Sequence, residues 1–385
     1  MQIKNQTWLN DPDLQQVMGV LNKYGTKARI VGGAVRDALM GFSEIGDIDI
    51  ASALTPEQNM DLLESPDIKV YPTGIQFGTI TAVINDKTFE ITTLRQDVDT
   101  DGRHAQVEFT DDWLEDAKRR DFTFNALYLD MDGTVHDPLN GYQDLLDRRV
   151  RFIGAPLERI KEDALRILRF YRFFGEISSG NLDDKGHEAA KSLKSDLRGL
   201  SGERVWQEFR KILLSNNAPK VLKIMCEAGI LYEILPENEG VSNFCNYFEL
   251  ENSLNIEDDI GRLSCLLPYD QEIISDTAKK LRLSNKQSDV LSKYGKEYPY
   301  HDLDQKTLRR VMYETGKDIL IHYLCLRGKL TKEILEYIQS YKIPLFSIQG
   351  KDLIIQGWAP GVALGLELNR LEKKWIESDF KSLKN

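Results

Sequence analysis

Cysteine is scarce in this chain, whose 385 residues include only Cys226, Cys245, Cys265 and Cys325. These residues are widely spaced and form no CxxC pair, so we expect neither a disulfide framework nor a zinc knuckle. No apolar run reaches the length of about 18 residues that a membrane-spanning helix needs. The N-terminal stretch lacks an apolar segment followed by a small-residue cleavage site, so we expect no secretion signal and a cytoplasmic protein.

Basic residues are fewer than acidic ones, and the formal net charge is −11. Its distribution is uneven: residues 1–150 carry 14 Lys and Arg against 26 Asp and Glu, whereas residues 276–385 carry 20 against 14. Because a nucleic-acid backbone responds to the local potential, the overall negative charge does not exclude RNA as a partner. On their own, such swings are more typical of solvated helix faces.

The first 150 residues alternate short strand-like runs with helical ones, which predicts an α/β domain built on one sheet. We expect strands at Lys27–Val31 and Asp47–Ala51, and a hairpin that turns at Asn85–Asp86. The helix predicted after this hairpin runs from Asp111 to Tyr128. A single helix is predicted for Glu158–Ile177, and helical patterns continue almost to the C-terminus.

The glycine pair Gly32–Gly33 follows the first predicted strand and begins the segment GGAVRDALMG, which we expect to be a helix. Glycines at a strand-to-helix turn let the backbone approach a phosphate, and the helix N-terminus offers free N–H groups. Arg36 lies one turn into the helix and can add a forked donor to phosphate oxygens. A plain strand-to-helix turn would have the same pattern.

Asp47 and Asp49 flank Ile48 in the second predicted strand. Alternation along a strand places the two carboxylates on one face, where they repel each other unless a cation lies between them. Such an oxygen-rich site suits Mg²⁺, which retains waters and bridges substrate phosphates. Glu90, in the segment TFEITTLR, is a candidate third ligand or an ordinary residue of the sheet face.

Two further groups of charged residues follow. Arg120, Asp121 and Asn125 lie in the predicted helix 111–128 and are suited to phosphate, ribose or metal contacts. By itself, this basic cluster is more typical of a solvated face.

In the predicted helix 158–177, Asp163 and Arg166 are three residues apart and therefore neighbours on one face. Cytosine and adenine present an exocyclic amine donor beside a ring-nitrogen acceptor, whereas uracil and guanine present a carbonyl beside an N–H. A fixed carboxylate next to a fixed guanidinium accepts the first pair of bases and rejects the second. Arg169 and Arg172 continue the same row. The alternative is a surface ion pair with two solvated arginines.

With these groups in this order, the sequence resembles the class II tRNA nucleotidyltransferases, the bacterial CCA-adding enzymes, which share a family with poly(A) polymerases. The matching segments are GGAVRD, DID, TTLRQDVDTDGRHAQVEFTDDWLEDAKRRDFTFNA, DPLNGYQDLLDRRVRFIG and EDALRILRFYRF. The resemblance is strong to about residue 215 and looser beyond. One departure is Ala164, where many members have proline.

The resemblance implies a polymerase-beta-like α/β head followed by an all-α neck, body and tail, in an elongated seahorse shape. We expect the head at 1–150, a base-recognising neck at 151–215, a body at 216–275 and a tRNA-binding tail at 276–385. The loop from Asp97 to Gln106, with Gly102 as a hinge, is the candidate for switching from C to A addition.

The resemblance also assigns roles to residues. Asp47 and Asp49 hold Mg²⁺ and are catalytic. Nucleotide-binding roles fall to Gly33, Arg36, Arg120, Asp163, Arg166, Arg169 and Arg172, with Gly32, Asp121, Asn125 and Glu90 as further candidates. The implied partners are tRNA, CTP and ATP, with no membrane and no required protein partner.

Three alternatives remain at this point. An enzyme that adds only the terminal A, and a poly(A) polymerase, share the same head. The absence of a basic-aromatic segment after DID argues against a poly(A) polymerase. The polar loop argues against an enzyme that adds only CC, whereas an enzyme that adds only A stays open. A non-catalytic RNA-binding protein on this scaffold would be expected to lose an aspartate of the pair or Arg36.

Overall fold

The computed structural model describes residues 1–3, 6–100, 105–177, 182–296 and 304–381. The chain divides into two compact units, Met1–Ile234 and Leu235–Asn385. This boundary differs from the one expected at 215/216, because α10 (Ala218–Glu227) packs on α7 and α9 of the first unit. The division into head, neck, body and tail stays a prediction.

The first unit contains a seven-stranded mixed sheet in the order β3-β4-β5-β2-β1-β8-β9. β2 and β5 are parallel, and the other neighbouring strands are antiparallel. The turn between β4 and β5 has positive φ at both Asn85 and Asp86, as the hairpin signal in the sequence predicts. The strands are β1 (Ala28–Val31), β2 (Asp49–Ser52), β3 (Lys69–Gly74), β4 (Thr79–Ile84), β5 (Lys87–Thr93), β8 (Tyr128–Leu129) and β9 (Val135–His136).

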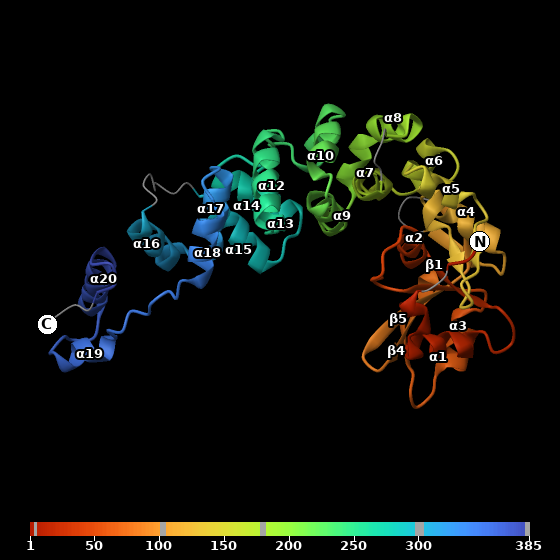
Figure 1. Ribbon diagram of the computed structural model, residues 1–385, viewed down its shortest axis with the longest axis horizontal. Coiled ribbons are helices and arrows are strands. Elements are labelled where there is room, and N and C mark those ends of the chain that lie inside the picture. The colour runs from red at the N-terminus through yellow and green to blue at the C-terminus, as the bar shows by residue number, and fades with distance from the viewer. Residues whose placement is uncertain (4–5, 101–104, 178–181, 297–303, 382–385) are drawn as a thin grey trace. The chain divides into compact units, whose positions relative to one another are not determined.

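Helices cover both faces of this sheet, and alternation along the strands sends neighbouring residues to opposite cores. Ile30 and Ile50 face one core, to which α1 (Pro12–Leu21), α2 (Gly33–Leu39) and α3 (Pro56–Leu63) contribute. Figure 1 shows α1 and α3 beside β4 and β5. The next residues, Val31 and Ala51, face a second core with Ala117 of α4 (Trp113–Arg119).

A separate hairpin, β6 (Arg95–Thr100) and β7 (Ala105–Phe109), follows β5 directly. Its base is tied to the main sheet, because the Leu94 amide donates to the Ser52 carbonyl and the Thr110 amide donates to the Leu94 carbonyl. The expected switching loop, Asp97 to Gln106, falls on this hairpin, and its centre at 101–104 lies outside the described residues.

The helix predicted from Asp111 to Tyr128 is wrong beyond Arg119. The chain leaves α4 in an extended conformation at Arg120, forms a short 3-10 turn at Thr123–Asn125 and enters β8 at Tyr128. Tertiary packing overrides the helical pattern here. Phe122 and Phe124 lie in an aromatic cluster whose other members are Phe152, Phe170 and Phe173.

The single helix predicted for Glu158–Ile177 is also wrong. α6 (Pro156–Glu162) ends at an extended Asp163, and α7 (Leu165–Ile177) begins two residues later. One Asp163 carboxylate oxygen accepts from the Leu165 amide at 3.1 Å, which stabilises the start of the second helix. The remaining helices of this unit are α5 (Gly141–Leu146), α8 (Asp184–Ser192), α9 (Gly202–Leu214), α10 and α11 (Leu231–Ile234).

The second unit is helical throughout the part that the structure describes, which confirms the all-α prediction (Figure 1). Among the described residues, no helix combines the length and the apolar character needed to cross a membrane. The helices are α12 (Ser242–Leu254), α13 (Asp259–Ser264), α14 (Gln271–Lys280), α15 (Asn285–Tyr294), α16 (Gln305–Thr315), α17 (Lys317–Leu326), α18 (Lys332–Ser340), α19 (Gly350–Ile355) and α20 (Val362–Glu377).

Candidate active site

The pairing of β1 with β2 brings the glycine turn and the aspartates together. Val31, the last residue of β1, lies opposite Asp49, the first residue of β2. Gly32 follows Val31 directly and has φ +74°, a conformation that glycine adopts without strain. The turn that begins α2 therefore lies next to an Asp49 carboxylate at one end of the sheet.

Asp49 also lies beside Glu90, its partner in the parallel pairing of β2 with β5. Burial raises the pKa of the Asp49 carboxyl above its usual value, and the negative charges of Glu90 and Asp47 add to this rise. Asp47 is exposed and precedes β2 rather than lying in it, which corrects the predicted strand 47–51. The carboxylates are nevertheless near enough to interact electrostatically.

These oxygen ligands suit a divalent cation. Among the described residues, no three His, Cys, Asp or Glu side chains converge closely enough to hold a metal ion by themselves. Mg²⁺ does not need such a cage, since it is commonly held by one or two carboxylates together with waters and substrate phosphates. The repulsion that raises the pKa of Asp49 is relieved by a cation between the carboxylates, so this donor set fits Mg²⁺.

Arg120 lies against the same turn. A side-chain carbon built on Gly32 would lie 3.9 Å from its Nη1 atom, and its positive charge acts to lower the pKa of Asp49. The guanidinium is held by Asp116, whose Oδ2 accepts from Nε at 3.2 Å and from Nη2 at 3.1 Å. Arg120 thus places a fixed positive charge between the glycine turn and the aspartates.

A series of hydrogen bonds connects Arg36 to Arg169 through Asn125 and Asp121. Arg36 Nη1 donates to Asn125 Oδ1 at 3.2 Å, and Asn125 Nδ2 donates to Asp121 Oδ1 at 3.0 Å. The other Asp121 oxygen accepts from Arg169 Nε at 2.7 Å. Burial acts to raise the pKa of Asp121, but the charge of Arg169 and the Asn125 hydrogen bond outweigh burial and lower it. Asp121 and Asn125 are therefore buried connectors between Arg36 and α7.

Asp163 and Arg166 do not form the predicted neighbouring pair on one helix face. Asp163 Oδ2 accepts from Arg204 Nη2 of α9 at 2.8 Å, while Arg166 Nη1 donates to Glu162 Oε2 at 2.5 Å. Asp163 lies at the break between α6 and α7, outside both helices, and each of the two side chains has a charged partner of its own. Arg166 is near the end of α4, since its Nη2 also donates to the carbonyl of Arg119.

Arg169 and Arg172 converge on Glu208 of α9, a residue that the sequence analysis did not identify. Glu208 accepts from Arg172 Nε at 2.6 Å and from Arg169 Nη1 at 3.5 Å. The Arg172 guanidinium is buried and stacks 3.9 Å from the Phe173 ring centroid. Arg169 keeps 30% of its side-chain surface exposed, whereas Arg172 is committed to internal contacts.

A cavity of about 630 Å³ lies beside this network in the first unit. Arg36, Arg172 and Lys211 line it together with three carboxylates, Asp37, Glu44 and Glu176. Neither Asp49 nor Arg120 lines it. Of the site residues predicted from the sequence, only Arg36 and Arg172 line this cavity.

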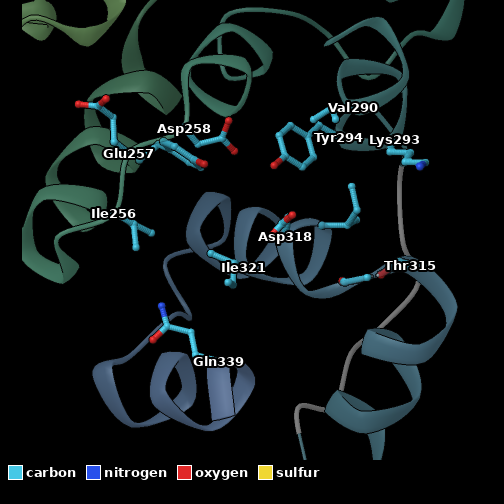
Figure 2. Close-up of a pocket in the computed structure, with 13 residues that line it drawn as sticks. Ile256, Glu257, Asp258, Val290, Lys293, Tyr294, Thr315, Asp318, Ile321 and Gln339 are labelled. Atoms are coloured by element: carbon cyan, nitrogen blue, oxygen red, sulfur yellow. Dashed lines mark hydrogen bonds between the residues drawn. The ribbon is translucent and has the colours of Figure 1, made fainter. Parts of the chain in front are cut away.

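The second unit has a cavity of about 500 Å³, lined by residues of α15, α17 and the connection between α12 and α13. Figure 2 shows Asp258, Tyr294 and Asp318 facing this space and Lys293 at its edge. Glu257 adds a third carboxylate to the lining. With three carboxylates and one lysine, this lining disfavours a bound phosphate.

Comparison with known proteins identifies the family. The Poly A polymerase head domain matches residues 28–151, and the model described as a probable RNA and SrmB-binding site of polymerase A matches residues 181–240. The human mitochondrial CCA tRNA nucleotidyltransferase 1 is 34% identical, over 97% of this chain and 88% of that protein. The chain belongs to the class II CCA-adding enzymes.

Other members of the CCA-adding family agree with this assignment. The CCA-adding enzyme of Lactobacillus helveticus is 30% identical over 94% of this chain and 92% of that protein. The crystal structure of the Bacillus stearothermophilus CCA-adding enzyme in complex with CTP has a TM-score of 0.75 and 25% identity, covering 96% of this chain and 94% of that one. The α/β head with a helical remainder is thus the fold of the family.

The buried ion pair between Arg172 and Glu208 generates a stability prediction. Glu208→Ala should destabilise the packing of α7 on α9 by about 3 kcal/mol, because it removes the buried partner of Arg172 and leaves Glu176, whose side chain is 32% exposed, as its counterion. Amide hydrogen exchange of α9 in the intact chain measures this change. Glu158→Gln, which breaks the exposed pair with Lys161, is the control and should alter protection by less than about 0.5 kcal/mol. Equal protection in both variants would contradict the prediction.

Proposed function

We propose that this chain adds C, C and A to the 3′ end of tRNA from CTP and ATP, without a nucleic-acid template. Similarity to CCA-adding enzymes over nearly the whole chain supports this proposal. So does the CTP bound by the related Bacillus stearothermophilus enzyme. The observation that carries it is the β1–β2 pairing, which juxtaposes the Gly32 turn, Asp49 and Arg120.

Asp47 and Asp49 would hold Mg²⁺ at the reacting phosphate. Bound there, the metal supplies charge stabilisation for the attacking hydroxyl and the departing pyrophosphate. The tRNA 3′-oxygen forms a bond to the α-phosphorus as the bond from that phosphorus to the α,β-bridging oxygen breaks. Pyrophosphate leaves with the bridging oxygen, and the hydroxyl proton passes to solvent. The aspartates orient this in-line exchange, and Glu90 adds negative charge beside Asp49.

Gly33, Arg36 and Arg120 would bind the nucleotide around the same turn. The first amides of α2 face a site without a side-chain cap, since Gly32 has none to offer. Arg120 contributes a guanidinium held in place by Asp116. Anion binding at a glycine turn with an adjacent arginine is a common arrangement for phosphates.

Base selection would require an exchange of partners. Asp163 is paired with Arg204, and Arg166 with Glu162. An incoming cytosine or adenine offers an amine to Asp163 and a ring nitrogen to Arg166, so it can replace those partners, whereas uracil and guanine cannot. Arg169 follows Arg166 by three residues in α7.

The basic C-terminal part would bind tRNA through phosphates and shape. Gly357 and Gly361 have φ of +97° and +148° in the connection between α19 and α20, and Lys351 lies in α19. These glycines allow the RNA backbone to approach closely. None of the four cysteines, all of which the structure describes, forms a disulfide, and this supports a cytoplasmic location.

A direct test uses a transcript of tRNA that ends before the first C. We expect the purified protein, with Mg²⁺, CTP and ATP, to extend it by C, C and A, as sequencing of the products would show. Extension only of a substrate that already ends in CC would instead identify an A-adding enzyme, and a long A tail would identify a poly(A) polymerase.

The same assay tests the aspartates. Asp47→Ala and Asp49→Ala should each reduce incorporation by about a thousandfold or more. Each substitution removes a ligand of the cation that stabilises the charge developing in the transition state. Glu158→Gln, an exposed substitution in α6, should leave incorporation unchanged. Undiminished incorporation by both aspartate variants would refute the proposed metal site.

Asp163 and Arg166 are tested by base choice. Asp163→Ala and Arg166→Ala should let UTP or GTP compete with CTP and ATP, because the groups that reject them are gone. Competition assays with paired nucleotides measure the ratio of kcat/KM values. A lower overall rate with unchanged base choice would contradict the selective role.

A further inference from the structure

Asp116 in α4 is fully buried, yet it carries charge and contacts several parts of the candidate site. Its Oδ1 atom accepts from Arg119 Nε at 2.7 Å, and its Oδ2 atom accepts from both Nε and Nη2 of Arg120. The Tyr128 hydroxyl in β8 donates to Oδ2 at 2.8 Å. These donors lie at the end of α4 and at the start of β8, the two ends of the connection between this helix and the central sheet.

Asp116 also reaches the hairpin that follows β5. The amide of Arg95, the first residue of β6, donates to Asp116 Oδ1 at 3.4 Å. β6 packs on α4, and the β6–β7 hairpin holds the polar loop expected to control the change from C to A. One carboxylate thus bonds both the base of this hairpin and the arginine beside the Gly32 turn.

The electrostatics favour a carboxylate at this position rather than a neutral residue. Burial acts to raise the pKa of Asp116, but the charges of Arg120 and Arg119 outweigh burial and hold it below its usual value. Hydrogen bonds to a buried ionised group are stronger than neutral ones and fix both partners. An amide at this position would offer one acceptor oxygen instead of two and would direct N–H groups at an arginine.

The carbonyl groups at the end of α4 connect this helix to α6 and α7 through hydrogen bonds. The Arg120 carbonyl accepts from Arg159 Nη2 at 2.8 Å, and the Arg119 carbonyl accepts from Arg166 Nη2 at 3.3 Å. A shift of the α4 terminus would therefore move Arg120 and also disturb the contacts of Arg166, the proposed base-reading arginine.

We propose that Asp116 is a positioning residue for nucleotide transfer, one that holds Arg120 against the glycine turn and couples it to the base of the β6–β7 hairpin. The proposal rests on the proposed function, because Arg120 is taken there as a ligand of the triphosphate. Asp116 itself, being fully buried, acts through Arg120 and Arg95 and not on the substrate.

The test is Asp116→Asn in the full chain. We expect KM for CTP and for ATP to rise by about tenfold, because the triphosphate loses a fixed guanidinium, while kcat for the first C falls less. Because the hairpin base is loosened as well, products ending in CC should accumulate relative to CCA at saturating ATP.

Glu251→Gln is the matched control. Glu251 is a fully buried carboxylate that accepts from Arg262 Nε at 2.6 Å in the second unit, so its substitution also removes a buried ion pair. It should lower thermal stability without changing either KM or the ratio of CC to CCA products. Unchanged KM values and product ratio in Asp116→Asn would overturn the proposal, and a raised KM with an unchanged ratio would overturn the coupling to the hairpin.

A second variant covers the case in which Asp116→Asn does not fold. Tyr128→Phe removes one donor to Oδ2 but keeps the ring that packs edge-on against Trp113 at 5.2 Å. It should raise KM for both nucleotides severalfold, and wild-type KM values in a folded variant would contradict the proposal. Failure of the wild-type protein to extend tRNA would instead reject the proposed function, so the two outcomes are distinct.

Discussion

The pairing of β1 with β2 is the constraint on which the candidate site depends. With Val31 opposite Asp49, the turn at Gly32 and the first acidic residue of β2 leave the sheet at the same end. The parallel pairing with β5 then adds Glu90 beside Asp49. A slip of one residue in the β1–β2 register would send Asp49 to the opposite face and separate it from the turn.

Around this end of the sheet, carboxylates hold the arginine side chains in place through ion pairs. Asp116 fixes Arg120, Asp121 fixes Arg169, and Glu208 fixes Arg172. A buried guanidinium without a counterion is costly, so each of these carboxylates determines where its arginine lies. The donors proposed to meet a nucleotide, Arg120 and Arg169, are consequently set in place before it binds, which is how a site gains from preorganisation.

Much of this arrangement was predictable from the sequence. Strand alternation identified the sheet, the Asn85–Asp86 turn and the helical remainder, and the glycine pair marked the turn beside Asp49. Local patterns failed where distant contacts decide the structure. The aromatic cluster around Phe122 ends α4 early, although the alternation Phe-Thr-Phe was a signal against a helix. Similarly, Asp163 caps α7 instead of continuing a helix, and its partner Arg204 lies far along the chain.

The central claim is that Asp47 and Asp49 hold a divalent cation against a nucleotide bound at the Gly32 turn. Crystals of the full chain grown with CTP and Mn²⁺, a substitute for Mg²⁺ with a measurable anomalous signal, test it most directly. We predict an anomalous peak within coordination distance of both carboxylates and of the triphosphate. A peak elsewhere, with the triphosphate away from Gly32 and Arg120, would contradict the account.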